Sequence, residues 1–331
     1  MSPASPDKRI FQSEPVWTNL SGNFLRKTLA ESTPIRLLIK HWGRCEWSAT
    51  SFWKFQNGKC YLRWNYICES FIVRNNAIQR KDAIINTTEQ KQSEYSDVFV
   101  VIPMLNEEES IGPVLGDLPP VSAVIVVDNG SEDSGPDIAK QHGATVVFES
   151  QRGYGKACLT GIAKATELIE ASGRDDRDPV IVFLDADYSD YPNEMPLLVD
   201  SILRGEHDFV IGSRARGERE SGAMPFQAVF GNWLACSLVR LFWGVKFTDL
   251  GPFRAIRFRS LQALGMVDEN FGWTIEMQIK AIKAGLRIDE VPVSYRRRVG
   301  ISKISGTVSG TIRAGYKIIY TIFKYRFLTS K

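Results

Sequence analysis

The sequence lacks the features that mark several large classes of protein. It has only five cysteines in 331 residues, an odd number without metal-ligand spacing, so we expect reduced thiols in a cytoplasmic protein. Residues 1–10 contain no apolar run of the kind that a secretory signal needs. The longest uncharged stretch, 221–239, is interrupted by proline, glutamine, glycine and asparagine, whereas a transmembrane helix needs about 20 predominantly apolar residues. We therefore expect this stretch to be a partly buried or membrane-facing element of a soluble fold.

The chain also lacks a strong overall charge. Its net charge is only +3, which argues against a general nucleic-acid binder, and its 44% apolar and 24% charged residues are ordinary for a globular protein. The charge is unevenly placed, because no acidic residue follows Glu290 while nine lysines and arginines do. Such a basic end predicts an anionic substrate or contact with an anionic membrane surface.

The first 95 residues differ in composition from the rest. They hold five of the eight tryptophans and three of the five cysteines, yet show no sustained period of 2 or 3.6. The stretch 79–96 is polar and reads as a linker. We therefore treat residues 1–95 as an N-terminal extension, poorly ordered or of unknown role. Two interpretations stay open: a partner-binding segment, or upstream sequence included by a wrong start codon.

Short apolar runs alternate with helical patterns from residue 98 onward. Runs of consecutive valine and isoleucine, rather than alternating ones, are typical of strands buried on both faces of a parallel sheet. The alternation predicts a three-layer α/β domain with a mostly parallel central sheet. The expected strands are 98–102, 123–127, 145–148, 180–184 and 209–211, and the expected helices lie near 107–115, 133–141, 154–170 and 193–203. In such sheets ligands bind at the carboxyl ends of the strands.

Two aspartates, Asp185 and Asp187, directly follow the apolar run 180–184. Residues i and i+2 leaving an extended strand point the same way, so the two carboxylates should converge. They would repel one another unless a cation lies between them or one is protonated. Oxygen ligands suit Mg²⁺ or Mn²⁺, and such an ion can neutralise a departing nucleoside diphosphate. The alternative is a pair of carboxylates that only form a turn or cap a helix.

Other polar segments follow the remaining runs. Segment 106–109 could hold a ligand or simply begin a helix, with Asn106 as N-cap. Asp128 could bind a ribose or a base, or form a turn in Asp-Asn-Gly-Ser. The glycine-rich stretch 152–156 can approach an anion, although it matches neither the P-loop nor the dinucleotide pattern. The basic run 296–298 is either a phosphate clamp or a solvated loop.

Taken in order, these segments resemble inverting family 2 glycosyltransferases of the GT-A fold, and most of all the polyprenyl-phosphate (dolichyl-phosphate) mannose and glucose synthases. The matching stretches are Val-Ile-Pro-x-Leu-Asn-Glu-Glu, Val-Val-Asp-Asn-Gly-Ser, Arg-Gly-Tyr-Gly-Lys-Ala, Asp-Ala-Asp, Gly-Ser-Arg, Thr-Asp-Leu-Gly-Pro-Phe-Arg-Ala, Ile-Glu-Met and Arg-x-x-Gly-x-Ser-Lys. They cover roughly residues 97–305, and an ordered set is far more specific than any one motif. The implied glycosyltransferase domain spans 96–305, followed by a basic amphipathic C-terminal helix at 306–331.

The resemblance implies roles for particular residues. Those that would hold the donor nucleotide sugar are Pro103, Asn106, Glu107, Asp128, Gly153, Lys156 and Asp185. Asp185 and Asp187 would bind the metal, Mg²⁺ or Mn²⁺, and Arg297 and Lys303 would bind phosphate. Arg214 and Asp249 would line the donor sugar and acceptor. Two departures from the family affect these roles: Ser189 replaces a frequent glutamine, and the stretch 249–254 differs from the usual Thr-Ser-Gly-Phe-Arg.

The need for a catalytic base depends on the acceptor. A lipid phosphate is already ionised near neutral pH, whereas a hydroxyl acceptor needs a base within about 3 Å of the attacking oxygen. Glu276 and Asp249 are the candidates, and with Arg214 they form the predicted catalytic set. Glu276 could equally be a structural carboxylate that pairs with an arginine.

Three functions remain in competition. The first is transfer of a hexose from a nucleoside-diphosphate sugar to an acceptor, with a polyprenyl phosphate favoured and a soluble hydroxyl acceptor as the alternative. The second is a non-catalytic nucleotide-sugar-binding or scaffolding protein. A sugar nucleotidyltransferase is the third and is disfavoured, because those enzymes need a glycine-rich loop after the first strand. The basic tail favours contact with the inner face of the membrane over simple packing of a helix on the domain.

Overall fold

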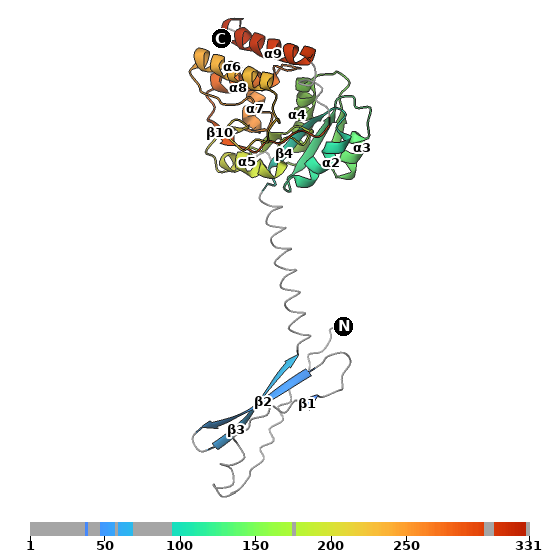
Figure 1. Ribbon diagram of the computed structural model, residues 1–331, viewed down its shortest axis with the longest axis vertical. Helices are drawn as coiled ribbons and strands as arrows, with labels where there is room; N and C mark the ends of the chain where they lie inside the picture. Colours follow the sequence, from blue (N-terminus) through green and yellow to red (C-terminus); the bar gives the residue numbers. More distant parts are fainter. Residues whose placement is uncertain are drawn as a thin grey trace. The chain divides into compact units, whose positions relative to one another are not determined.

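The computed structural model describes residues 95–173, 177–300 and 308–328, together with three strands in the N-terminal part of the chain (Figure 1). Contacts divide the chain into two units, Met1–Ile85 and Asn86–Lys331. The strands of the first unit form a separate antiparallel sheet: β1 (Leu37–Leu38), β2 (Trp47–Gln56) and β3 (Lys59–Cys68). This sheet was not among the expected elements, although the sequence Asn57-Gly58 between β2 and β3 is typical of two-residue hairpin turns.

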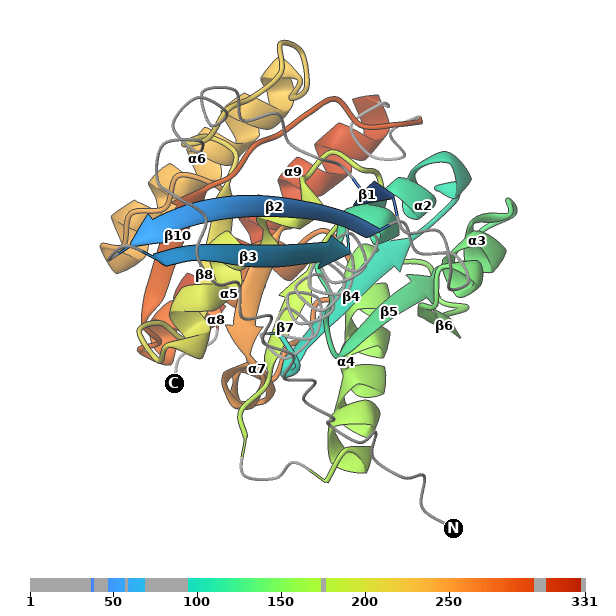
Figure 2. The same ribbon diagram turned by 90° about the horizontal axis from the view of Figure 1, so that it is seen from below.

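The second unit is built on a seven-stranded sheet in the order β10-β8-β9-β7-β4-β5-β6. Its strands are β4 (Val98–Met104), β5 (Ala123–Asp128), β6 (Thr145–Phe148), β7 (Val180–Phe183), β8 (Phe209–Ser213), β9 (Arg254–Arg257) and β10 (Ile288–Pro292). All neighbours are parallel except β9, which runs antiparallel to both β7 and β8. Figure 2 shows β7, β4 and β5 side by side. The predicted mostly parallel α/β sheet is therefore confirmed.

Strand β9 was not predicted. Its sequence, Arg-Ala-Ile-Arg, has charged ends, yet Arg254 is completely buried. The Arg254 guanidinium donates to the carbonyl oxygens of Gly251 at 3.0 Å and Thr274 at 2.9 Å, which replaces its lost hydration. Because the Thr274 carbonyl lies on α8, 20 residues away, the burial of this arginine could not be read from the local pattern.

Helices cover both faces of the sheet, as a three-layer fold requires. They are α2 (Glu108–Asp117), α3 (Gly135–Gln141), α4 (Tyr154–Ala171), α5 (Met195–Leu203), α6 (Phe226–Trp243), α7 (Phe258–Leu264), α8 (Trp273–Lys283) and α9 (Val308–Phe323), with short helical turns η1 (Pro192–Glu194) and η2 (Lys324–Leu328). One hydrophobic core joins the sheet to α2, α3 and α5, and the other joins it to α4 and α6–α9. Alternate residues of β4 enter the two cores, with Val100 in one and Val101 in the other.

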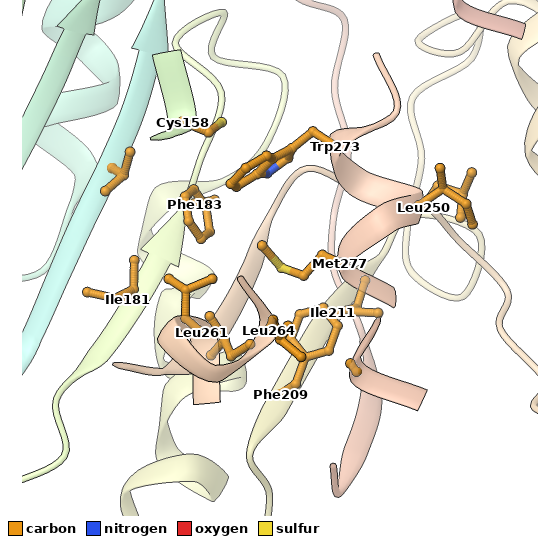
Figure 3. Packing of buried hydrophobic residues seen from close by; sticks show 14 of the residues in the cluster. Cys158, Ile181, Phe183, Phe209, Ile211, Leu250, Leu261, Leu264, Trp273 and Met277 are labelled. Carbon is orange, nitrogen blue, oxygen red and sulfur yellow. The ribbon is translucent and has the colours of Figure 1, made fainter. Parts of the chain in front are cut away.

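The second core fixes the start of α8 against the middle of the sheet. Trp273, the first residue of α8, is buried and packs edge-on against Phe183, with ring centroids 5.7 Å apart (Figure 3). Phe183 is the last residue of β7, so this contact lies directly before the two predicted metal-binding aspartates. The segment that leads into α8 is thereby held beside the carboxyl edge of the sheet.

Helix α6 covers most of the uncharged stretch 221–239. It buries Ala235, Cys236 and Val239 and exposes Phe226 and Trp233, so it is partly buried as expected. Among the described residues, the structure contains no helix that combines the length and the apolar character needed to cross a bilayer.

Candidate functional site

Several loops meet at the carboxyl edge of the sheet and enclose a cavity of about 320 Å³. Since β7, β4 and β5 are parallel neighbours, the residues that follow them lie along one edge. The predicted site residues in the cavity wall are Pro103, Glu107, Gly153, Asp185 and Asp187. Other residues of the wall were absent from the predicted set, among them Asn129, Arg152, Tyr154, Asn270, Phe271 and Arg298. The cavity therefore combines motifs from distant parts of the chain.

Asp185 and Asp187 both face this cavity. The Tyr154 hydroxyl donates to Asp185 Oδ1 at 3.0 Å. Asp187 Oδ1 accepts from the backbone N–H of Ser189 at 3.0 Å and from the Ser189 hydroxyl at 2.5 Å. Burial, together with the neighbouring charge of Asp187, raises the pKa of Asp185 to about 7. A raised pKa means that this site favours a proton or a cation beside the pair.

Arg298 supplies positive charge to the same cavity. Its guanidinium donates to Glu107 Oε1 at 2.6 Å and lies 3.2 Å from Asp187 Oδ2. Glu107 and Arg298 are 191 residues apart in the chain, so this contact is purely tertiary. Arg298 thus links the loop after β4 to the loop after β7. Such a charged group can also donate to phosphate oxygens.

Two predicted nucleotide-binding residues mainly shape the loops around the cavity. Asp128 Oδ1 accepts a hydrogen bond from the Ser131 N–H at 2.7 Å. This bond forms the Asp-Asn-Gly-Ser turn, which was the alternative to binding a ribose or a base. Asn106 Oδ1 accepts from the Glu132 N–H at 2.7 Å, which ties the loop after β4 to the loop after β5. Neither residue belongs to the wall of the main cavity.

Asn129, the neighbour of Asp128, connects the loop after β5 to the glycine-rich segment. Its amide nitrogen donates to the carbonyl oxygens of Glu149 and Gln151, at 3.0 and 2.8 Å. Its side-chain oxygen accepts from the Gly153 N–H at 2.8 Å. Three hydrogen bonds of this side chain therefore hold the segment that leads into α4.

The glycines at the start of α4 allow a close approach of another backbone. A Cβ atom on Gly153 would overlap the Glu269 carbonyl oxygen, and one on Gly155 would overlap that of Asp268. The Lys156 N–H donates to the Glu269 carbonyl at 2.8 Å, and its Nζ lies 3.9 Å from a Glu269 carboxylate oxygen. Lys156 thus contacts the 268–271 segment rather than the cavity wall. The close packing brings Asn270 and Phe271 into the wall.

Glu276 belongs to the support of that segment. Its buried carboxylate accepts from the Asp268 N–H at 2.7 Å and the Tyr325 hydroxyl at 2.6 Å, and it lies 2.8 Å from Lys280 Nζ. Nearby, Lys317 Nζ of α9 lies 2.9 Å from Asp268 Oδ2. Glu276 lies outside the main cavity wall. The geometry fits the structural alternative, although its partners are a lysine, a tyrosine and backbone rather than an arginine.

Arg214 and Asp249 form a separate buried pair. The Arg214 guanidinium donates to both Asp249 oxygens, at 2.8 and 2.7 Å, and the Arg214 N–H donates at 2.8 Å. Arg214 also lies over the ring of Tyr295, 5.1 Å from its centroid. Asp190 is buried nearby, and neither of its oxygens has a hydrogen-bond partner among the described residues. Burial holds the pKa of Asp190 well above its usual value.

The basic run 296–298 divides into three environments. The Arg296 guanidinium stacks on Tyr188, 3.3 Å from the ring centroid. Arg297, the predicted phosphate ligand, donates to the Ser221 carbonyl at 2.7 Å, and only Arg298 reaches the cavity. Lys303, the other predicted phosphate ligand, lies outside the described residues. Consecutive arginines carry no local signal that tells which one points inward.

Comparison with known proteins identifies the family of the chain. The family model described as "Glycosyl transferase family 2" matches residues 99–265. An uncharacterized glycosyltransferase of Mycobacterium tuberculosis (strain ATCC 25618 / H37Rv) is 35% identical over 225 residues, covering 66% of this chain and 94% of that protein. A dolichyl-phosphate hexose transferase of Haloferax volcanii is 33% identical over 221 residues, covering 65% and 90% of the two chains.

Solved structures share the fold at lower identity. Glucosyl-3-phosphoglycerate synthase from Mycobacterium tuberculosis, crystallised with Mn²⁺, uridine-diphosphate-glucose and phosphoglyceric acid, superposes with a TM-score of 0.53 at 21% identity. The superposition covers 73% of this chain and 83% of that structure. The likeness places the described domain in the same α/β fold.

Proposed function

Because the chain belongs to glycosyltransferase family 2, we propose that it transfers a hexose from a nucleoside-diphosphate sugar to a polyprenyl phosphate, with inversion, using Mg²⁺ or Mn²⁺. The observation that supports this best is the cavity in which Asp185, Asp187 and Arg298 face one another. Two carboxylates and a guanidinium suit a metal-bound diphosphate, whereas a neutral ligand would leave their charges unmatched.

The residues present fit a divalent cation that takes some of its ligands from the protein and the others from the nucleotide. Asp185 and Asp187 supply carboxylate oxygens, the donor type that Mg²⁺ and Mn²⁺ prefer. The described residues contain no group of three acidic, histidine or cysteine side chains arranged to hold an ion. Mg²⁺ typically takes only one or two carboxylates and completes its shell with phosphate and water. A cation bound in this way would stabilise the negative charge on the leaving diphosphate.

The chain's own residues contribute binding and orientation. Arg298 is placed to donate to the diphosphate, and Asn129 accepts from the Gly153 N–H, which keeps the glycine-rich backbone in position at the cavity wall. Phe271 and Asn270 form another part of the wall through the packing of segment 268–271 on α4. Fixed donors and charges of this kind stabilise developing negative charge without having to reorganise during the reaction.

The state of the two predicted bases favours a phosphate acceptor. Asp249 is paired with Arg214, and Glu276 is occupied by Lys280, Tyr325 and a backbone N–H. An ionised phosphate needs no base, so these engaged carboxylates create no difficulty. The name of the Haloferax relative, a dolichyl-phosphate hexose transferase, supports the same acceptor class. A soluble hydroxyl acceptor is the second candidate, and Asp190 favours it as a carboxylate that has no hydrogen-bond partner among the described residues.

A panel assay tests the proposed reaction. Purified protein is incubated with Mn²⁺, radiolabelled UDP- or GDP-hexoses, and either a short-chain polyprenyl phosphate or soluble acceptors such as phosphoglycerate. We expect label in the lipid-extractable product and release of free nucleoside diphosphate. Label confined to water-soluble product would replace the lipid acceptor with a hydroxyl acceptor. Absence of turnover with every donor would contradict the proposal.

Metal binding should depend on pH because Asp185 has its pKa raised to about 7. Below that value the carboxyl holds a proton, which a cation must displace. We expect the affinity for Mn²⁺ alone to rise up to about tenfold per pH unit from pH ~5.5 to ~7 and then to level off. Isothermal titration calorimetry measures it. In Asp185→Asn the affinity should be low and nearly flat over this range, and a flat profile in the unaltered protein would contradict the expectation.

The surface formed by α6, α9 and η2 supports a membrane-facing role, as an acceptor embedded in a bilayer requires. Its exposed apolar side chains are Phe226, Phe230, Trp233, Leu241, Ile312, Tyr316, Tyr320, Phe323, Phe327 and Leu328. The helices pack together through Phe242, whose ring meets those of Phe323 and Phe327 at 5.6 and 5.8 Å. Basic residues on α9 and η2 complement anionic lipid, as in interfacial helices. We propose peripheral attachment to the cytoplasmic membrane face.

Vesicle binding provides the measurement. Phe226 and Trp233 are 82% and 61% exposed, so replacing both with serine should cost little stability. We expect Phe226→Ser/Trp233→Ser to lower the affinity for phosphatidylglycerol-containing vesicles by about tenfold or more, since each buried aromatic ring contributes about 1.5–3 kcal/mol. Phe148→Ser, at a 66% exposed position on the edge strand β6, is the matched control. Equal sedimentation of all three proteins would exclude this surface as the attachment site.

A further inference from the structure

Arg298 occupies the position that matters most for metal binding at Asp187. Asp187 Oδ1 already accepts two hydrogen bonds from Ser189, which leaves Oδ2 as the more available oxygen. Arg298 Nη1 lies 3.2 Å from that Oδ2. A guanidinium and a divalent cation cannot share one carboxylate oxygen without strong repulsion. In this arrangement a metal ion at Oδ2 would compete with Arg298.

The surroundings of Arg298 leave its side chain able to change partners. The Val299 N–H donates to the Asp187 carbonyl at 3.0 Å, which holds the backbone beside the site. The neighbouring Arg296 is stacked between Tyr188 and Tyr191, with centroid distances of 3.3 and 4.1 Å. By contrast, the Arg298 side chain is 25% exposed, and its Nε is buried without a hydrogen-bond partner in the part of the chain that the structure describes. A fixed backbone with an incompletely bonded guanidinium suits local exchange of partners.

We propose that Arg298 is a partner-exchanging residue of the donor site. In the free enzyme it neutralises Asp187 and Glu107 and opposes binding of the metal alone. When the metal arrives with the nucleoside diphosphate, the guanidinium leaves Asp187 Oδ2 and donates to the diphosphate. The metal then binds well only together with the nucleotide. This inference rests on the proposed function and deepens it, because it assigns the order in which the site accepts its ligands.

The proposal makes Mn²⁺ and nucleotide respond in opposite directions to one substitution. In Arg298→Gln, the affinity for MnCl₂ alone should rise about threefold to tenfold, because a competing positive charge is gone. The affinity for UDP or GDP in saturating Mn²⁺ should fall about 10- to 100-fold, because a charge-assisted hydrogen bond is lost. Isothermal titration calorimetry measures both quantities without any need for turnover.

Two further variants separate this effect from a loss of structure. Arg298→Lys keeps the charge, so its affinity for Mn²⁺ alone should stay as in the unaltered protein while nucleotide affinity falls. Arg204→Gln removes an arginine whose partner is Glu206, at 2.8 Å on an exposed pair outside the cavity, and should change neither affinity. Thermal melting of each variant confirms that it is folded.

The outcomes are distinct. A rise for Mn²⁺ with a fall for nucleotide supports the exchange. Parallel losses, or an unchanged affinity for Mn²⁺ alone, overturn it, since Arg298 would then be a structural or a simple phosphate-binding residue. Asp187→Asn is titrated in parallel to test the metal site itself. If Mn²⁺ binding survives in Asp187→Asn, the proposed function loses its metal site; if it is lost there but unaffected by Arg298→Gln, only the exchange fails.

Discussion

Asp187→Asn should reduce kcat/KM for hexose transfer by about 10³-fold, the size of loss seen when a main source of transition-state charge stabilisation is removed. The asparagine amide keeps the shape of the carboxylate. It loses the negative charge that lies beside Asp185 in the cavity wall. A neutral side chain binds Mg²⁺ or Mn²⁺ weakly, so the leaving diphosphate would keep its charge. Steady-state kinetics over a range of Mn²⁺ concentrations measures the loss.

The same substitution should leave the fold intact, which separates a functional effect from unfolding. Asp187 repels Asp185, whose pKa it helps to raise, so neutralising it relieves strain that partly offsets the lost contact with Arg298. We expect the melting temperature to change by no more than about 4 °C. Asp137→Asn, which removes an exposed carboxylate near Lys140 on α3, is the control and should retain full activity. Activity of Asp187→Asn within tenfold of the unaltered protein would contradict a metal role.

Arg214→Met should destabilise the protein by about 3–5 kcal/mol, the cost of leaving a buried charge without its partner. Asp249 is completely buried, and each of its two carboxylate oxygens accepts a hydrogen bond from the Arg214 guanidinium. Without the arginine, its carboxylate must be protonated or remain uncompensated in a medium of low dielectric constant. Urea unfolding monitored by tryptophan fluorescence measures the change in the free energy of unfolding.

A double substitution distinguishes a structural pair from a catalytic one. Arg214→Met/Asp249→Leu removes both charges together, so it should recover much of the stability lost in Arg214→Met. Replacement of Arg204, whose ion pair with Glu206 is exposed, should have little effect. The catalytic role predicted for Arg214 and Asp249 from the family resemblance would change kcat rather than the free energy of unfolding. It requires kcat to fall in a variant whose unfolding curve is unchanged.

The positions of five strands along the chain could be predicted because burial on both faces leaves a direct mark on sequence, whereas their order in the sheet could not. Five consecutive apolar residues, as in 98–102, have no other common explanation in a chain that alternates with helical segments. The position of Asp185 and Asp187 followed from the same reasoning, since polar residues after a buried strand emerge at the ligand-binding edge. Local pattern and global fold agree in these segments.

The rest of the site depends on contacts between distant segments. Arg298 meets Glu107 across 191 residues, and no spacing rule separates Arg298 from Arg297. Asn270 and Phe271 enter the cavity wall only because Gly153 and Gly155 leave room for the backbone of segment 268–271. Side-chain direction in loops is set by tertiary packing, which a single sequence does not display. The sequence therefore predicted the motifs, but it did not predict the other residues of the cavity wall.

Helix α9 is joined to the wall of the main cavity. Lys317 holds Asp268, Tyr325 of η2 holds Glu276, and Glu276 in turn holds the backbone of the segment that presents Asn270 and Phe271. If the nucleotide also binds best to one arrangement of this segment, a ligand or surface that favours one arrangement through α9 changes the affinity for the nucleotide. By thermodynamic reciprocity the nucleotide must then change the affinity of α9 for that ligand by the same factor. The free-energy coupling between these two sites can thus be measured from binding affinities alone, separately from the rate of hexose transfer.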